Sequence, residues 1–289
     1  MHRKFQMLAL SLIVIVVGSY VIVAQTPMTG EWTATFKPEK ENKVQLNFTR
    51  RSEKGGRNSH GSGFDLNDLQ GLSAADLTAA DVPVRFSLVR EAGTIEAEGR
   101  FQNGRGSGTF RYTPNHNFAS AMQNRGFAFR DEQLFSATML NLTTSFVDDL
   151  KSANFPNLQT DDLFKAVIFK VTPQFMSEMS SIGFPNLDME DLVKARIFKI
   201  DAEFAREARA MGFTNVDMED LTKLRIFKVT LEFVREVNAE GLTNLSVKDA
   251  TELRIFKIDA AFIRQAKAEN VPINVRTLVD KKIGVYRIR

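Results

Sequence analysis

The chain repeats the stretch Ile197-Phe198-Lys199-Ile200 four times, with Val or Ile at the last position. The copies are Ile168-Phe169-Lys170-Val171, Ile197-Phe198-Lys199-Ile200, Ile226-Phe227-Lys228-Val229 and Ile255-Phe256-Lys257-Ile258. A constant step of 29 residues is the signature of a tandem array whose units pack on their neighbours. Such arrays build extended surfaces rather than enclosed pockets, so the first expectation is a scaffold or binding protein.

Each unit predicts two helices. In Asp188–Val216, Asp188 is an expected N-cap, followed by apolar residues at helical spacing, which together predict a first helix, helix A. Asp201 is the expected cap of a second helix, helix B, which Gly212 ends. We expect neighbouring units to cover helix A on two sides, with the Ile-Phe pairs in the core.

The array is expected to fill residues 116–289. A phenylalanine recurs on helix B in step with the period, at Phe146, Phe175, Phe204, Phe233 and Phe262. A lone helix B is expected around Phe118–Phe127, and the last good one at Ala261–Glu269, after which the tail diverges. Degenerate ends are typical of the capping units of an array.

Residues 30–115 predict an antiparallel β module, so the expected fold class is α+β: a meander or small barrel followed by a solenoid-like array of helical hairpins. Five stretches alternate apolar and polar residues: Trp32–Phe36, Val44–Phe48, Val84–Leu88, Thr94–Phe101 and Gly106–Tyr112. Asn103-Gly104 is a two-residue hairpin signal. Ser52–Gly63 is expected to be a loop, and Ser73–Ala79 a short helix.

The glycines of the module allow two functional interpretations. Gly104–Gly108 resembles a phosphate-binding loop, but no Lys-Ser/Thr follows it, so a turn and a bulged strand are expected instead. Gly30-Glu31-Trp32 resembles the start of lipocalin-type barrels. This leaves open a small barrel that binds an apolar ligand, for which a large cavity around Trp32 would be required.

Residues 1–24 predict a signal peptide or an N-terminal membrane anchor. Arg3 and Lys4 precede an apolar run over residues 7–24, and the sequence around Ala24 suits cleavage. The run is long for a signal peptide and almost long enough to span a bilayer, so both alternatives stay open. In either case we expect an exported protein, in the periplasm or cell envelope, whose contact with the membrane is limited to this segment.

Charge and composition exclude several classes. Residues 117–289 hold 24 bases and 24 acids, so the array lacks the basic field that nucleic-acid binding requires. We therefore expect no nucleic-acid partner. The chain also has no cysteine, which excludes disulfides and cysteine-based zinc sites.

No pattern predicts catalysis, a cofactor or a metal. The histidines are His2, His60 and His116; none pairs at metal-ligand spacing, and the last two are expected in exposed turns. No nucleophile elbow, zinc-protease helix or Walker loop is present. We expect a non-enzyme; a hydrolase would need a cleft in which distant acids converge.

The repeat predicts ladders of charged residues, one of which is the candidate interaction face. Its members are Lys170, Lys199, Lys228, Lys257, Arg196, Arg225 and Arg254. A ladder of acids stands at the helix starts, at Asp162, Asp191, Asp220 and Asp249. Two interpretations remain open: charges that complement the helix dipoles, or a binding stripe along a repeated face.

Several motifs resemble those of an uncharacterised group of bacterial envelope proteins with a β module and two-helix repeats of about 29 residues. They are Val84-Arg85-Phe86, Arg90–Thr94, Glu98-Gly99-x-Phe101, Gly104-x-Gly106-x-Gly108 and the repeated Gly-Phe-x-Asn-Leu. The resemblance covers roughly residues 30–270. In that group such modules are also appended to membrane metallopeptidases of the beta-lactam-sensor type. This chain lacks the peptidase His-Glu-x-x-His, and has Phe198-Lys199 where the relatives have His-Gly.

The sequence thus predicts an exported, non-enzymatic scaffold that binds an envelope protein or a peptide through its helical repeat surface. The alternative is a small-barrel carrier of an apolar ligand, with the repeats as its docking module.

Overall fold

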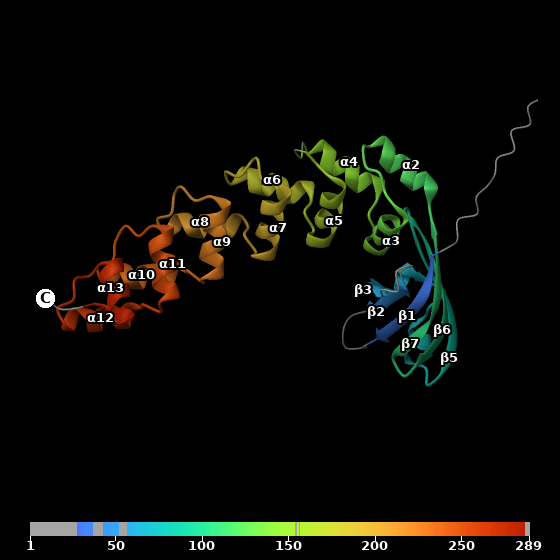
Figure 1. The fold of residues 1–289 in the computed structure, drawn as a ribbon, viewed down its shortest axis with the longest axis horizontal. Helices are drawn as coiled ribbons and strands as arrows, with labels where there is room; N and C mark the ends of the chain where they lie inside the picture. The colour runs from blue at the N-terminus through green and yellow to red at the C-terminus, as the bar shows by residue number, and fades with distance from the viewer. Residues whose placement is uncertain (1–27, 37–42, 52–56, 154, 156, 287–289) are drawn as a thin grey trace, which may run out of the picture.

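The computed structural model describes residues 28–36, 43–51, 57–153, 155 and 157–286. The predicted α+β class is confirmed: a curled antiparallel sheet is followed by an elongated array of helices (Figure 1). The N-terminal apolar segment lies outside the described residues. Within the described part, no helix has both the length and the apolar character needed to cross a bilayer.

The sheet has seven strands in the order β3-β2-β1-β7-β6-β5-β4. Their bounds are β1 Met28–Phe36, β2 Lys43–Arg51, β3 Arg57–Asp65, β4 Leu69–Gln70, β5 Val82–Arg90, β6 Gly93–Gln102 and β7 Arg105–Pro114. This is the order of an up-and-down barrel that is open between β3 and β4. The short helix α1 (Ala74–Thr78) begins at a capping box made by Ser73 and Asp76, as predicted for this stretch.

Two predictions for the sheet are wrong. Residues 57–63, expected in a loop, belong to β3, which pairs with β2 from Lys43↔Asp65 to Arg51↔Arg57. Pairing with β2 stabilises β3, whose own side chains add little to the core. Among the described residues of β3, Phe64 is the one that is buried. The bulge expected after Gly104 is also absent, since the β6–β7 register is unbroken from Gly93↔Pro114 to Gln102↔Arg105.

The glycines make room for Trp32. A Cβ atom at Gly99 would lie 2.8 Å from the Trp32 ring, and one at Gly106 would lie 2.7 Å from it. The indole is 1% exposed, meets Phe86 edge-on with 5.1 Å between ring centroids, and donates from Nε1 to the Glu98 carbonyl at 3.1 Å. Side chains of the protein therefore fill the sheet interior at this point.

The array consists of alternating A and B helices. The A helices are α3 Asp131–Leu140, α5 Thr160–Phe169, α7 Met189–Ile197, α9 Met218–Ile226, α11 Val247–Ile255 and α13 Val275–Lys282. The B helices are α2 His116–Asn124, α4 Thr144–Ser152, α6 Pro173–Ser181, α8 Ala202–Ala210, α10 Leu231–Ala239 and α12 Ala260–Ala268. A helices pack on neighbouring A helices along the array, and B helices on B helices.

Each B helix is set by a local pattern. In α4, α6, α8, α10 and α12 the N-cap side chain accepts a hydrogen bond from the backbone N–H of the recurring phenylalanine three residues on. In the central units that phenylalanine is buried: Phe175, Phe204 and Phe233 are 3%, 2% and 6% exposed. The cap and the buried ring together fix where helix B starts and which face it buries.

The first A helix joins the sheet to the array. Phe135 of α3 meets Phe48, Phe110 and Tyr112 of the sheet, with ring centroids 5.1–6.4 Å apart. The Tyr112 hydroxyl donates to the Ala92 carbonyl at 3.0 Å, and burial raises the pKa of Tyr112 to about 12. The sheet and the first units therefore share one hydrophobic core.

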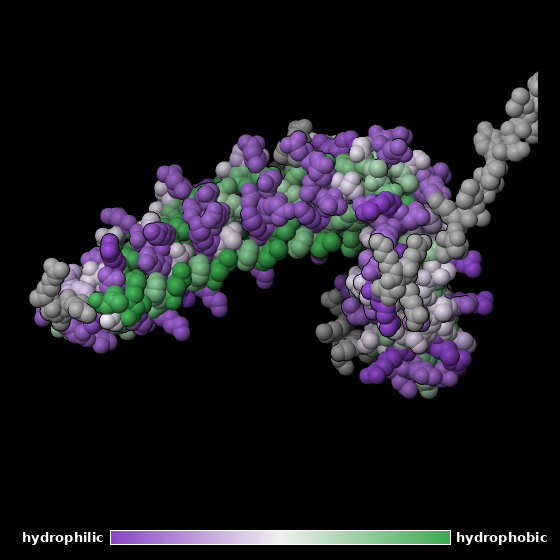
Figure 2. Space-filling view, viewed as in Figure 1, coloured by the Kyte–Doolittle hydropathy of each residue, from purple (hydrophilic) through white to green (hydrophobic). Residues whose placement is uncertain are grey.

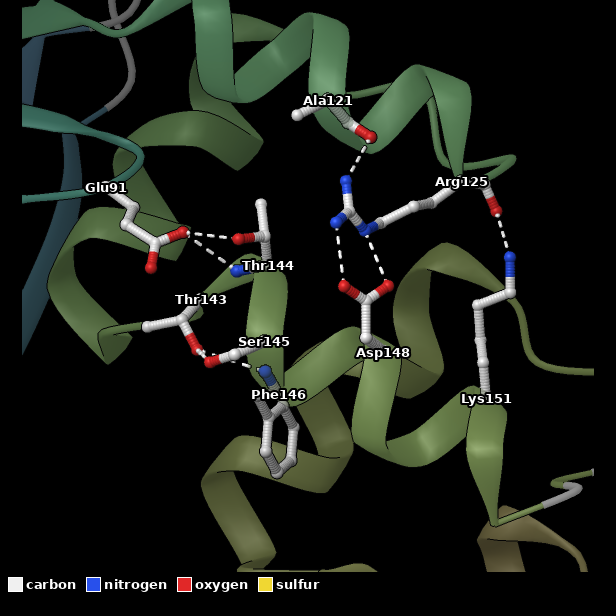
Figure 3. A network of polar contacts seen from close by, with 9 residues as sticks. All are labelled: Glu91, Ala121, Arg125, Thr143, Thr144, Ser145, Phe146, Asp148 and Lys151. Carbon is white, nitrogen blue, oxygen red and sulfur yellow. Dashed lines mark hydrogen bonds and ion pairs between the residues drawn. The ribbon is translucent and has the colours of Figure 1, made fainter.

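Polar contacts reinforce this junction (Figure 3). The Glu91 carboxylate, in the β5–β6 turn, accepts from the Thr144 backbone N–H at 2.9 Å and hydroxyl at 3.0 Å. Arg125, after α2, makes two 2.7 Å hydrogen bonds to Asp148 of α4. Lys151 donates to the Arg125 carbonyl at 3.1 Å. The first B helices are thereby tied to each other and to the sheet.

Candidate functional site

The repeated tetrapeptide forms the ends of four A helices, α5, α7, α9 and α11. In α9 the backbone N–H of Val229 donates to the Leu224 carbonyl at 2.9 Å, and that of Lys228 to the Arg225 carbonyl at 3.2 Å. This is the Schellman arrangement, which places one residue in the left-handed conformation and brings two apolar residues together. Val229 and Leu224 are both buried, so the last position of the tetrapeptide belongs to the core.

Lysine occupies the left-handed position in four consecutive units. The φ angles are 55° at Lys170 and 53° at Lys199, Lys228 and Lys257. Glycine or asparagine is the usual residue at this position, because a Cβ atom makes the conformation unfavourable. The same chain uses Asn141 and Gly284 at the corresponding ends of α3 and α13. The lysines are therefore present despite a backbone cost.

The arginines of the predicted face link successive units. Arg196 donates to the Lys170 carbonyl, with N–O distances of 3.0 and 2.6 Å, and its guanidinium lies 3.8 Å from the Phe175 ring centroid. Arg225 makes the same contacts one unit on, with Lys199 and Phe204, and Arg254 reaches the Phe227 carbonyl and the Phe233 ring. Each arginine thus clamps its own unit to the preceding one.

The lysines of the predicted face are different, because their ammonium groups project from the array. Lys170, Lys199, Lys228 and Lys257 are all exposed. Over the described residues, none of the four forms an ion pair. We call these four residues the Lys row.

The lysines in the middle of the A helices are paired. Lys194 lies 3.1 Å from Asp191, Lys223 lies 2.7 Å from Glu219, and Lys165 bonds Glu190 of the next unit. The hydrogen bond that Lys194 donates to the Asp191 carboxylate raises the pKa of Lys194, the direction expected for a paired ammonium. The positive charge of these three lysines is therefore compensated within the array, whereas that of the Lys row is not compensated among the described residues.

The acid ladder has local partners. The backbone N–H of Asp191 donates to Asp188 at 2.9 Å, and Asp249 accepts from the Ser246 backbone N–H at 3.0 Å and hydroxyl at 2.6 Å. Acids also stand in the first turn of five A helices from α3 to α11, where the helix dipole favours them.

The isoleucines of the repeat correct the expectation that the Ile-Phe pairs are core. Ile168, Ile197, Ile226 and Ile255 are 54%, 52%, 49% and 51% exposed, and the adjoining phenylalanines are half-buried. We call these isoleucines the Ile row. The neighbouring unit covers the buried stripe of helix A but does not extend over this edge, which is why helical spacing alone misplaced them.

The Ile row recurs once per unit over four consecutive units, in α5, α7, α9 and α11. Figure 2 shows an apolar stripe along the lower edge of the array, with hydrophilic side chains projecting from it at intervals. Ile283 and Val285, beyond the end of α13, are also exposed, at 52% and 60%. The sequence contained a signal for this exposed edge, because the apolar residues of helix A extend over more of its surface than two neighbouring units can cover.

The structure does not assemble a metal centre from the described residues. No group of three or more His, Asp or Glu side chains is placed to hold a metal ion in this part of the chain. His116 is exposed at the start of α2. His60 was expected in an exposed turn, and this is wrong: it lies on β3, half-buried, with 5.5 Å between its ring centroid and that of Phe135.

The β module offers little to an apolar ligand. Trp32 fills one part of the interior of the curled sheet, and Phe135 of α3 fills another part of the same inner face. A hollow of about 710 Å³ on the sheet is lined by charged residues that include Arg85, Glu98 and Arg111. An apolar ligand would leave these charges unsolvated.

Comparison with protein-family models, with curated proteins and with solved structures finds no match to this chain.

Proposed function

We propose that this chain is an exported, non-enzymatic scaffold that binds another envelope protein or a peptide through the exposed ends of its A helices. The observation that carries the proposal is the coincidence of the Ile row and the Lys row on four consecutive units. A contiguous exposed apolar stripe on a soluble array is a common mark of a binding site.

The backbone supports a functional role for the lysines. A non-glycine residue in the left-handed region costs free energy, and such residues concentrate at functional sites. Here the cost is incurred at Lys170, Lys199, Lys228 and Lys257, and the ammonium groups form no ion pair in the described structure. Backbone conformation alone favours glycine at these positions, and a requirement for exposed positive charge accounts for the lysines.

Export is proposed from the N-terminal sequence and from the resemblance to bacterial envelope proteins. Two basic residues followed by an apolar run over residues 7–24 are typical of a signal peptide or an anchor. The partner would then be a component of the same compartment.

A crosslinking pull-down from native envelopes tests the proposal. The bait is the whole chain, compared with the double charge reversal Lys199→Glu with Lys228→Glu. The matched control is Arg206→Glu with Arg235→Glu, which changes the net charge equally on exposed residues of the B helices. We expect a specific partner that the lysine variant loses and the arginine variant keeps. A partner retained by both variants, or recovery of nothing above background, contradicts the proposed surface.

A further inference from the structure

Building on the proposed function, we infer that the occupant of the surface is an extended protein segment in which acidic and apolar residues recur about every third position. The Ile row and the Lys row stand two residues apart at the ends of α5, α7, α9 and α11, so they recur together over four units. A partner that covers both rows must offer apolar side chains and carboxylates in the same order along its length.

The charges of this surface favour an acidic partner. The A-helix lysines Lys165, Lys194 and Lys223 are neutralised by acids of the array, whereas the Lys row has no ion-pair partner among the described residues. Positive charge without a partner, beside exposed apolar surface, selects acidic ligands and rejects basic ones. A carboxylate that reaches each lysine would supply the missing ion pair.

The apolar side chains beside the Lys row favour a partner that also carries apolar residues. In each unit a half-buried phenylalanine, such as Phe198, lies in sequence between the exposed Ile197 and the exposed Lys199. Aromatic and aliphatic side chains together make the kind of floor on which extended peptides dock. Burial of four isoleucines that are about half exposed would add the hydrophobic part of the affinity.

The spacing of the units favours an extended partner. Consecutive A helices, from α5 to α13, pack directly on each other, and packed helices lie about 8–10 Å apart. A polyproline II chain advances about 3.1 Å per residue, or about 9 Å per three residues. One apolar residue and one acid in every three residues of an extended segment therefore match one Ile-Lys pair per unit.

The shape of the molecule favours a narrow partner over a flat one. In Figure 1 the β module extends below the array at its first units, on the side where Figure 2 shows the apolar stripe. A flat bilayer that approached the stripe would meet the β module first. An extended segment can lie along the stripe without this obstruction.

The test is fluorescence anisotropy with three fluorescein-labelled peptides and the whole chain. The first probe is (Pro-Leu-Glu)5; the second, (Pro-Leu-Lys)5, reverses the charge, and the third, (Pro-Ser-Glu)5, removes the apolar residue. We expect the first peptide to bind at least tenfold more tightly than either of the others. Its affinity should fall as salt concentration rises, because the contacts with the Lys row are screened.

Variants of the chain test whether the peptide contacts the Lys row and the Ile row. Lys199→Glu with Lys228→Glu, and separately Ile197→Ser with Ile226→Ser, should each weaken the first peptide at least tenfold. Arg206→Glu with Arg235→Glu should leave it within twofold. The isoleucines are half exposed, so the serine variants are expected to fold, which circular dichroism and the melting temperature check.

Several outcomes overturn the inference. They are absence of binding by (Pro-Leu-Glu)5, equal binding by the reversed peptide, and insensitivity to both pairs of variants. Stripe-dependent binding to vesicles of phosphatidylglycerol and phosphatidylcholine would identify a membrane surface instead, and a stripe-dependent dimer in light scattering would identify a second copy. If the peptides fail while the envelope pull-down still loses its partner in the lysine variant, the proposed function stands and the assigned partner chemistry is wrong.

Discussion

The guanidinium of Arg225 lies 3.7 Å from the centre of the Phe204 ring and donates to the Lys199 carbonyl at 2.9 Å. The arginine belongs to one unit, and the ring and carbonyl belong to the unit before it. A single side chain therefore holds helix A of one unit against both the end of helix A and helix B of the previous one.

Replacing Arg225 by Ala should lower the free energy of unfolding by about 1–2 kcal/mol, the sum of a cation–π contact and a partly exposed hydrogen bond. Arg225→Lys should recover only part of this loss, because an ammonium cannot stack flat on a ring while it bonds the carbonyl. Urea unfolding measures both. Arg235→Ala, at an exposed position of α10, is the control and should change stability by less than about 0.5 kcal/mol. Equal effects at the two arginines would contradict the clamp.

Replacing Lys228 by Gly should raise the free energy of unfolding by about 0.5–1 kcal/mol, since φ is 53° at this residue and glycine adopts that conformation without a Cβ conflict. The same variant should weaken partner binding, so the effect of residue 228 on backbone stability and its effect on binding would have opposite signs. Gly241→Ala is the converse control: φ is 89°, no atom would contact the new Cβ atom within 4 Å, and a loss of about 1 kcal/mol is expected from backbone conformation alone. A Lys228→Gly protein that melts lower than the parent would refute the argument.

Phe204→Ala should destabilise the array by about 3–5 kcal/mol, because it removes a ring that is 2% exposed in a central unit. Phe146→Ala, at the half-buried corresponding position of the first complete unit, should cost less. Chemical unfolding of the two variants side by side tests this. Equal losses would argue against the graded burial along the array.

Gly106→Ala should destabilise the β module by about 1–3 kcal/mol, since the added Cβ would lie 2.7 Å from the Trp32 ring and 2.8 Å from the Phe101 ring. The rings fill the sheet interior and have little freedom to move. Tryptophan fluorescence during unfolding reports on this module directly, because Trp32 is the one tryptophan of the chain. Gly61→Ala on β3, where the nearest atom would be 3.4 Å away, is the matched control and should have a smaller effect.

The stability of the sheet–array junction should fall as the solution becomes mildly acidic. Burial, and then the nearby Arg50 guanidinium, hold the pKa of His60 below its ordinary value of 6.5, with Glu132 opposing. The folded state therefore favours neutral His60, so this contribution is fully present above pH 6.5 and is lost as pH falls from there toward the lowered pKa. Melting temperatures between about pH 7.5 and 5 should show a decline that His60→Gln removes, in a range above the titration of most carboxylates. An unchanged decline in the variant would assign it to other groups.

The sequence predicted the elements whose determinants lie within one unit. N-caps such as Asp188 and Asp201, and the glycine that ends helix B, act within a few residues, and the structure places them as expected. The strands with period-two alternation were predicted for the same reason. β3 was missed because its stability comes from pairing with β2, and its own sequence carries no alternating pattern.

The period of 29 residues by itself determined that residues after the sheet form stacked helical pairs, because identical local signals at identical spacing must fold into identical units. Tertiary structure alone decided which of the repeated residues remain at the surface. How far a neighbouring unit covers helix A depends on the packing of the units, which no single unit encodes; that packing leaves Ile197 exposed and buries Ile200 three residues on. It also directs Arg225 onto the preceding unit and leaves Lys228 in solvent, although the sequence offered both as one charged face.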